Sequence, residues 1–151
     1  MLEAGEAAPD FETQDQDGNA VRLADYLGKT VVLYFYPRAS TPGCTLEACA
    51  FRDATPAFDA AGAVILGVSP DTPKAQLKFA SRFGLPFRLL ADTDHAIAEK
   101  YGVWTEKSLY GRKYMGVDRS TFVIGPDGKI VRVFGKVKIA GHAKEVLRTV
   151  T

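Results

Sequence analysis

Apolar residues form two unbroken runs in the first half of the chain, and each run predicts a strand. The runs cover residues 30–36 and 63–69. Consecutive apolar residues, rather than alternating apolar and polar ones, are typical of strands that are buried on both faces of a parallel sheet. A third and shorter run predicts a strand over residues 87–91.

The first run is followed by residues that favour the start of a helix. Pro42 and Gly43 mark this start, and we expect the helix to reach about residue 53. Because proline lacks a backbone N–H and its ring clashes with the preceding turn, Pro56 is expected to interrupt the helix. A second helical stretch is predicted over residues 56–61.

The second run is also followed by a predicted helix. Thr72 is suited to cap its first turn, and Gly84 is suited to end it. Leu77, Ala80 and Phe83 lie at helical spacing, so we expect them to form the buried face of this helix.

Two hairpins and two further helices complete the pattern. Turn residues divide residues 9–22 into two short segments, and a Pro-Asp-Gly turn joins strands predicted at 120–124 and 130–134. Helices are predicted over residues 94–101, capped by the aspartate at its start, and over residues 140–149.

This order of elements predicts an α/β fold. Strands that alternate with helices, followed by a hairpin and a terminal helix, favour a central mixed sheet with helices on both faces. The first core strands are expected to be parallel and joined by right-handed crossovers, and the last hairpin should add antiparallel edges. A chain of 151 residues is expected to form a single domain, residues 1–151.

Composition and charge exclude several classes of function. The chain is 46% hydrophobic and 25% charged, with a formal net charge of +1. This balance is ordinary for a globular protein, and it predicts neither a nucleic-acid partner nor an anionic membrane surface. The longest run free of strongly polar residues, 60–68, is too short to span a bilayer, and no secretory signal is present. We therefore expect a cytoplasmic protein.

The candidate chemistry lies in the two cysteines, Cys44 and Cys49. Two cysteines do not make a disulfide scaffold, and in a reducing compartment such a pair is more often catalytic or metal-binding. Cys44 follows Thr41, Pro42 and Gly43 at a predicted strand-to-helix junction. Unpaired N–H groups and the positive end of the helix dipole there favour the reactive thiolate, and the glycine allows a substrate close to the backbone.

The spacing of the two cysteines has a geometric consequence. Residues five apart on a continuous α-helix have Cα atoms roughly 8.7 Å apart, whereas a disulfide requires less than about 7 Å. Cys44 and Cys49 therefore cannot form a disulfide while this helix is intact, and pairing them requires the first turns to unwind.

Other interpretations of these residues remain open at this point. Cys44 could be a small buried apolar residue, and Cys49 a helical residue facing the core. The two cysteines with His95 and His142 could hold zinc, although these histidines are expected to be exposed. A thiol-disulfide oxidoreductase that exchanges dithiols is a further alternative, but its usual C-x-x-C motif is absent. The last alternative is a binding domain without catalytic activity.

A family resemblance favours one interpretation. Pro37, Thr41 and Cys44 have the spacing P-x-x-x-T-x-x-C, which resembles the active-site signature of the peroxiredoxins, a family of thiol peroxidases. The longer sequence from Tyr34 to Cys49 resembles that of the bacterioferritin-comigratory (PrxQ) group. Other segments also resemble the sequences of this group, and they lie along nearly the whole chain. They are residues 8–11, 15–18, 67–69, 102–104, 119–122 and 127–130.

The resemblance implies a role for each site residue. Cys44 would attack the peroxide and become a sulfenic acid. The Thr41 hydroxyl would hydrogen-bond the thiolate and the peroxide, Pro37 would shield the pocket from water, and Arg119 would stabilise the thiolate and orient the peroxide oxygens. Cys49 matches the resolving position of family members that carry this cysteine five residues downstream, so an intramolecular disulfide is the implied product.

The resemblance also implies the fold, the substrates and the partners. The fold would be thioredoxin-like with an N-terminal β-hairpin extension. The substrates would be hydrogen peroxide and organic hydroperoxides, and thioredoxin or a similar dithiol would reduce the disulfide. No cofactor and no metal are implied. Because the disulfide needs no second chain, a monomer is expected.

Overall fold

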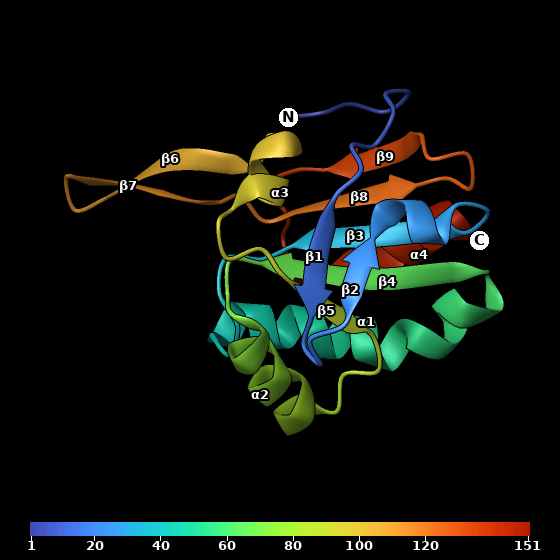
Figure 1. Ribbon diagram of the computed structural model, residues 1–151, viewed down its shortest axis with the longest axis horizontal. Helices are drawn as coiled ribbons and strands as arrows, with labels where there is room; N and C mark the ends of the chain where they lie inside the picture. Colours follow the sequence, from blue (N-terminus) through green and yellow to red (C-terminus); the bar gives the residue numbers. More distant parts are fainter.

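A mixed sheet of seven strands forms the centre of the computed structural model, which describes residues 1–151 (Figure 1). The strands are β1 (Glu12–Asp15), β2 (Ala20–Arg22), β3 (Thr30–Phe35), β4 (Ala63–Ser69), β5 (Arg88–Ala91), β8 (Ser120–Ile124) and β9 (Ile130–Phe134). They lie in the order β2-β1-β5-β4-β3-β8-β9. β4 is parallel to both β3 and β5, and the other neighbours are antiparallel. The predicted mixed sheet with two hairpins is confirmed.

Helices cover both faces of this sheet. They are α1 (Pro42–Ala60), α2 (Pro73–Phe83), α3 (Ala96–Lys100) and α4 (His142–Val150), with a short 3-10 turn, η1 (Leu23–Tyr26). Val32 and Tyr34 of β3 lie in a core cluster with residues of α1, α2 and α4, whereas Val31 and Leu33 lie in a second cluster with residues of α3. Burial on both faces explains why this strand is apolar throughout. None of the helices has both the length and the apolar character needed to cross a bilayer.

The predicted break at Pro56 is wrong, because α1 continues through this residue. Phe51 and Phe58, which flank the proline, are fully buried in the same core cluster. Burying an aromatic side chain stabilises by about 1.5–3 kcal/mol, and a proline inside a helix costs about 3 kcal/mol. The two buried phenylalanines together therefore offset the cost of the proline.

The ends of α2 are predicted correctly, but its buried face is predicted only in part. The Thr72 hydroxyl accepts a hydrogen bond from the backbone of Ala75 (3.2 Å), and Gly84 ends the helix in the left-handed conformation. Leu77 is exposed, whereas the polar Gln76 is fully buried. Gln76 occupies an inward position because its amide nitrogen donates to the Ser69 hydroxyl (2.7 Å) and to the carbonyl of Leu90 (3.0 Å).

The start of α3 also differs from the prediction. Asp94 accepts only a long hydrogen bond (3.3 Å) from the backbone of Ala96. Asp92, which is buried, instead accepts hydrogen bonds from the backbone of Ile97 (3.0 Å) and Ala98 (2.9 Å). The residue that caps α3 therefore lies two positions earlier in the chain.

One hairpin is absent from the sequence prediction. β6 (Trp104–Leu109) and β7 (Arg112–Val117) pair only with each other and project from the body of the protein (Figure 1). Most of their residues are polar or exposed, so they lack the apolar alternation that indicates a half-buried strand. Tyr110 and Gly111 join them with positive φ angles, as in the tight turns typical of hairpins.

Replacing Pro56 with alanine should stabilise the protein. Alanine restores the backbone N–H that the helix lacks at this position, and it removes the ring that crowds the preceding turn. Alanine also raises the conformational entropy of the unfolded chain slightly, which acts in the opposite direction. We expect the free energy of unfolding to rise by about 1–2 kcal/mol. Urea unfolding followed by circular dichroism measures the difference. A lower free energy of unfolding in the variant would show that Phe51 and Phe58 need the proline in order to pack.

Candidate active site

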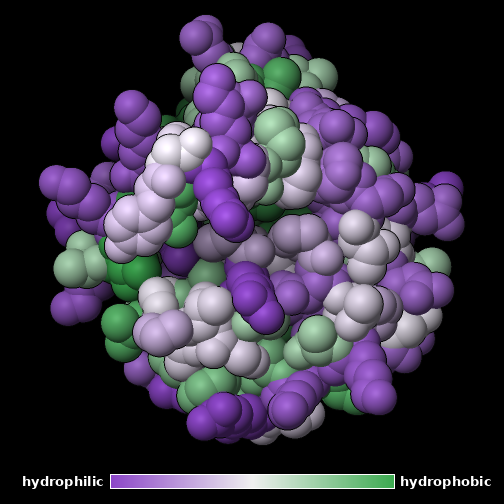
Figure 2. Space-filling model, turned by 90° about the vertical axis from the view of Figure 1, so that its left-hand side faces the viewer, coloured by the Kyte–Doolittle hydropathy of each residue, from purple (hydrophilic) through white to green (hydrophobic).

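Cys44 lies in the first turn of α1, at the edge of the sheet where β3 ends. Thr41 is the N-cap residue, and the first helical hydrogen bond runs from the backbone of Thr45 to the carbonyl of Thr41 (2.9 Å). The amides of Gly43 and Cys44 precede this bond, so they are free to face negative charge. Figure 2 looks onto this side of the molecule, where polar and apolar groups are interspersed around a hollow.

The structure places Arg119 beside Cys44, although 75 residues separate them. Arg119 follows β7 and leads directly into β8. Its Nη2 donates a hydrogen bond to the sulfur of Cys44 (3.2 Å). Cys44 is only 1% exposed, so this guanidinium is a cation beside a thiol that is almost withdrawn from water. The Nη2 donor is thus placed to stabilise negative charge that develops at or next to this sulfur.

Glu47 is a site residue that the sequence analysis does not indicate. Its Oε1 accepts a hydrogen bond from Arg119 Nη1 (2.6 Å), so Arg119 contacts Glu47 and Cys44 together. Glu47 is 2% exposed, and its Oε2 has no hydrogen-bond partner. Burial raises the pKa of this carboxyl from 4.5 to about 7, with Arg119 acting in the opposite direction. The sequence offered one indication of this role, because Glu47 follows Cys44 by three residues and residues three apart share a helix face.

Thr41 occupies the N-cap position, but its hydroxyl does not cap the helix. The hydroxyl donates to the carbonyl of Arg38 (2.9 Å). This hydrogen bond joins two residues of the segment between β3 and α1. The oxygen of Thr41 remains able to accept a hydrogen bond. Pro37 and Arg38 are exposed at the start of the same segment.

A network of polar side chains holds this segment. The Asp71 carboxylate accepts a hydrogen bond from the backbone of Ala39 (2.7 Å) and another from the Ser69 hydroxyl (2.6 Å). Ser69 in turn accepts from Gln76, which accepts from the Tyr36 hydroxyl. The ends of β3 and β4 and the start of α2 thus position the residues that precede α1.

Gly43 has little free space above it. A Cβ atom at this position would lie 3.3 Å from Cδ1 of Ile139 and 3.5 Å from Nη2 of Arg119. The absence of a side chain thus lets two side chains of the protein itself close onto the start of the helix. The sequence analysis proposed that the glycine allows a substrate close to the backbone, and it did not foresee these two side chains.

Cys49 lies on the same uninterrupted helix as Cys44, is half-buried, and is a free thiol, as is Cys44. An intact helix holds Cα atoms at this spacing roughly 8.7 Å apart. The structure therefore shows the two cysteines in the arrangement from which no disulfide can form without unwinding.

The four residues of the zinc alternative do not form a site. His142 is buried rather than exposed as predicted, and its Nε2 is hydrogen-bonded to the Thr121 hydroxyl (2.8 Å). His95 is half-buried and stacks on Trp104 with ring centroids 4.1 Å apart. No three His, Cys, Asp or Glu side chains gather in a group that could hold a metal ion.

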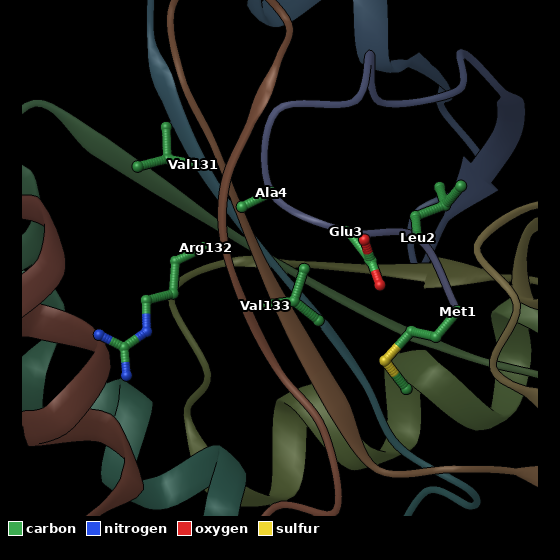
Figure 3. Close-up of a pocket in the computed structure, with 7 residues that line it drawn as sticks. All are labelled: Met1, Leu2, Glu3, Ala4, Val131, Arg132 and Val133. Carbon is green, nitrogen blue, oxygen red and sulfur yellow. The ribbon is translucent and has the colours of Figure 1, made fainter.

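A separate hollow of about 420 Å³ lies between the N-terminal residues and β9 (Figure 3). Its walls are Met1, Leu2, Glu3, Ala4, Val131, Arg132 and Val133. Figure 3 shows the guanidinium of Arg132 directed away from the N-terminal residues, so most of the lining is apolar. None of these residues belongs to the Cys44 site.

Comparison with known proteins identifies the family. The sequence model of the AhpC/TSA family matches residues 4–133. The chain is 47% identical to peroxiredoxin Bcp of Bacillus subtilis over 148 residues, which is 98% of this chain and 94% of that protein. The chain belongs to the AhpC/TSA family. It is thus a peroxiredoxin related to the bacterioferritin-comigratory (PrxQ) group, and the resemblance noted in the sequence is confirmed.

Solved structures agree with this peroxiredoxin fold. A mutant of peroxiredoxin Q from Xanthomonas campestris matches with a TM-score of 0.92 at 40% identity, over 98% of this chain and 97% of that one. The bacterioferritin comigratory protein of the same organism, studied for its alkyl peroxide reduction, matches with a TM-score of 0.91 at 41% identity, over 99% of this chain and 96% of that one. The thioredoxin-like fold predicted from the resemblance is confirmed.

Glu47 should make the protein less stable as the pH rises. Because the folded state raises the pKa of this carboxyl to about 7, it binds the proton more tightly than the unfolded chain does. The resulting stabilisation is complete below about pH 4.5 and is lost as the pH rises through about 7. A shift of one pKa unit corresponds to about 1.36 kcal/mol, so the loss is on the order of 3 kcal/mol.

The measurement is urea unfolding of the reduced wild type and of Glu47→Gln at several pH values between these limits. The glutamine keeps the shape of the side chain but cannot ionise. We expect the wild type to lose stability relative to the variant with rising pH. Parallel pH profiles for the two proteins would contradict the burial argument.

Proposed function

We propose that this peroxiredoxin reduces hydrogen peroxide and organic hydroperoxides with Cys44 as the attacking nucleophile. The observation that carries the proposal is the hydrogen bond from Arg119 Nη2 to the sulfur of Cys44 (3.2 Å) at the start of α1. The fixed cation and the free backbone amides face the buried sulfur, where negative charge develops during the reaction.

The first step follows from this geometry. The Cys44 thiolate attacks the terminal oxygen of the peroxide, an S–O bond forms and the O–O bond breaks. The leaving oxygen carries the electron pair away and takes up a proton, giving water or an alcohol, and Cys44 becomes a sulfenic acid. The guanidinium of Arg119 and the amides at the helix start stabilise the charge that moves onto the leaving oxygen. Thr41 would orient the peroxide through its hydroxyl, and Pro37 would limit the access of water.

Cys49 is proposed as the resolving cysteine. Its thiolate attacks the sulfur of the sulfenic acid, a disulfide forms, and the hydroxyl group leaves as water. Because the intact helix keeps the two cysteines apart, this step requires the first turns of α1 to unwind. The oxidised and reduced proteins therefore differ locally around residues 43–52.

A dithiol such as thioredoxin would complete the cycle by thiol–disulfide exchange. Leu46, which lies between the two cysteines, is exposed and offers an apolar contact to such a partner. A disulfide within one chain requires no second subunit, so a monomer made of a single domain, residues 1–151, is part of the proposal. A reducing compartment such as the cytoplasm would keep both thiols ready for reaction.

The test of this function is the intact mass of the reduced protein after one equivalent of hydrogen peroxide. Wild type should rapidly lose the mass of two hydrogens, Cys49→Ser should gain one oxygen, and Cys44→Ser should not react. A wild-type protein that stays at its reduced mass would exclude the peroxidase. Oxygen gained by Cys44→Ser would instead assign the attack to Cys49.

The unwinding of α1 can be measured by amide hydrogen exchange. Within residues 43–52, the amides that have helical hydrogen bonds, from Thr45 onward, should exchange at least tenfold faster in the disulfide form than in the reduced form, because these bonds are lost. Residues 57–60 at the far end of the same helix serve as the internal control, and their exchange should not change. Equal protection of residues 43–52 in both forms would show that the disulfide forms without unwinding.

A further inference from the structure

The segment between β9 and α4, residues 135–141, reaches across to the active site. The backbone N–H of Val137 donates to the carbonyl of Arg119 (3.2 Å), which ties the segment to the arginine. The side chain of Ile139 ends beside Gly43, where Cδ1 lies 3.3 Å from the position of a Cβ atom. The guanidinium of Arg119 approaches the same position to 3.5 Å. Ile139 and Arg119 therefore meet above the residue that precedes Cys44.

Ile139 has no evident role in the core. Val137 packs against the core cluster that contains Cys44, whereas Ile139 belongs to neither core cluster and is half-exposed. Its neighbours Lys138 and Ala140 are exposed. Ile139 is thus a branched apolar side chain that is held over the active site and keeps part of its surface free for another molecule.

The position of Ile139 relative to the reacting atoms suggests what that molecule is. A peroxide that reacts with Cys44 must place its O–O bond beside the sulfur and within reach of Arg119 Nη2, which donates to that sulfur. A carbon attached to the peroxide cannot hydrogen-bond the guanidinium, so an apolar surface next to the peroxide favours it. Ile139 offers such a surface beside Arg119 and Gly43, and burying apolar groups against one another is favourable.

We propose that Ile139 is a specificity-determining residue, whose side chain contacts the organic group of an alkyl or aryl hydroperoxide during its reaction with Cys44. This inference rests on the peroxidase function proposed above. Hydrogen peroxide carries no carbon, so it gains nothing from this contact. Ile139 therefore sets the preference between the two kinds of substrate and leaves the chemistry at the sulfur unchanged.

The experiment compares the second-order rate constants of Cys44 oxidation by cumene hydroperoxide and by hydrogen peroxide. Full-length reduced protein is mixed with each peroxide, quenched with a thiol alkylating agent and followed by intact mass. Ile139→Ala should lower the constant for cumene hydroperoxide about four- to sixteenfold, since each buried methyl or methylene group contributes about fourfold and one or two of the three that alanine lacks would contact the substrate. Its constant for hydrogen peroxide should stay within about twofold of wild type, which also shows that the site is folded.

Two variants serve as controls. Ile139→Leu keeps the apolar volume and should retain most of the preference of wild type. Lys138→Ala shortens the exposed neighbouring side chain and should leave both rate constants unchanged.

The outcomes separate this inference from the proposed function. Two rate constants that fall together in Ile139→Ala would show that Ile139 only supports Arg119, which overturns the specificity role. Two rate constants that both stay at their wild-type values in that variant also overturn it, while the peroxidase function stands. A wild-type protein that reacts with neither peroxide overturns the proposed function, and this inference with it.

Discussion

The contact on which this site depends is the guanidinium of Arg119 placed against two groups of one helix face. One nitrogen donates to Glu47 and the other to the sulfur of Cys44, so a single cation serves both a buried carboxyl and a buried thiol. Without it, Glu47 would be an unpaired acid withdrawn from water, and the sulfur of Cys44 would lose its charged hydrogen-bond donor. The same contact holds the first turns of α1 against the start of β8, so the chemistry and the local stability share one interaction.

That shared interaction sets up a conflict between two requirements. The attack proposed for Cys44 needs an intact first turn, whereas a disulfide between Cys44 and Cys49 needs that turn unwound. Glu47 lies between the two cysteines, and one of its oxygens has no hydrogen-bond partner. An incompletely satisfied buried carboxyl makes the folded turn less stable than a fully satisfied one would be. Phe51 and Phe58 are fully buried further along the helix, so their packing anchors the part of α1 that does not need to move.

The fold brings the supporting groups to the same edge of the sheet. β3 and β4 are parallel, so their carboxyl ends lie together where α1 and α2 begin. Ser69, Asp71 and Gln76 form a hydrogen-bonded network at this edge that reaches the backbone of Ala39. On the opposite side of the site, the segment after β9 places Ile139 over Gly43. Two parts of the fold, one on each side of the site, thus fix the approach to one sulfur atom.

Patterns that extend over only a few residues were enough to predict much of the secondary structure of this protein from its sequence. The buried run at 63–69, the two strands of the last hairpin and both ends of α2 follow from apolar runs, turn residues and caps, and they match the structure residue by residue. The residues around Cys44 likewise indicated the family, which the comparisons confirm, and they predict Cys44 as the attacking thiol. Tertiary structure decided what depends on partners far along the chain: the passage of α1 through Pro56, the inward side of α2, the burial of His142, and the meeting of Glu47 with Arg119. The physical reason is that burial and charge pairing are properties of neighbours in space, and no local pattern states which neighbours a residue will have.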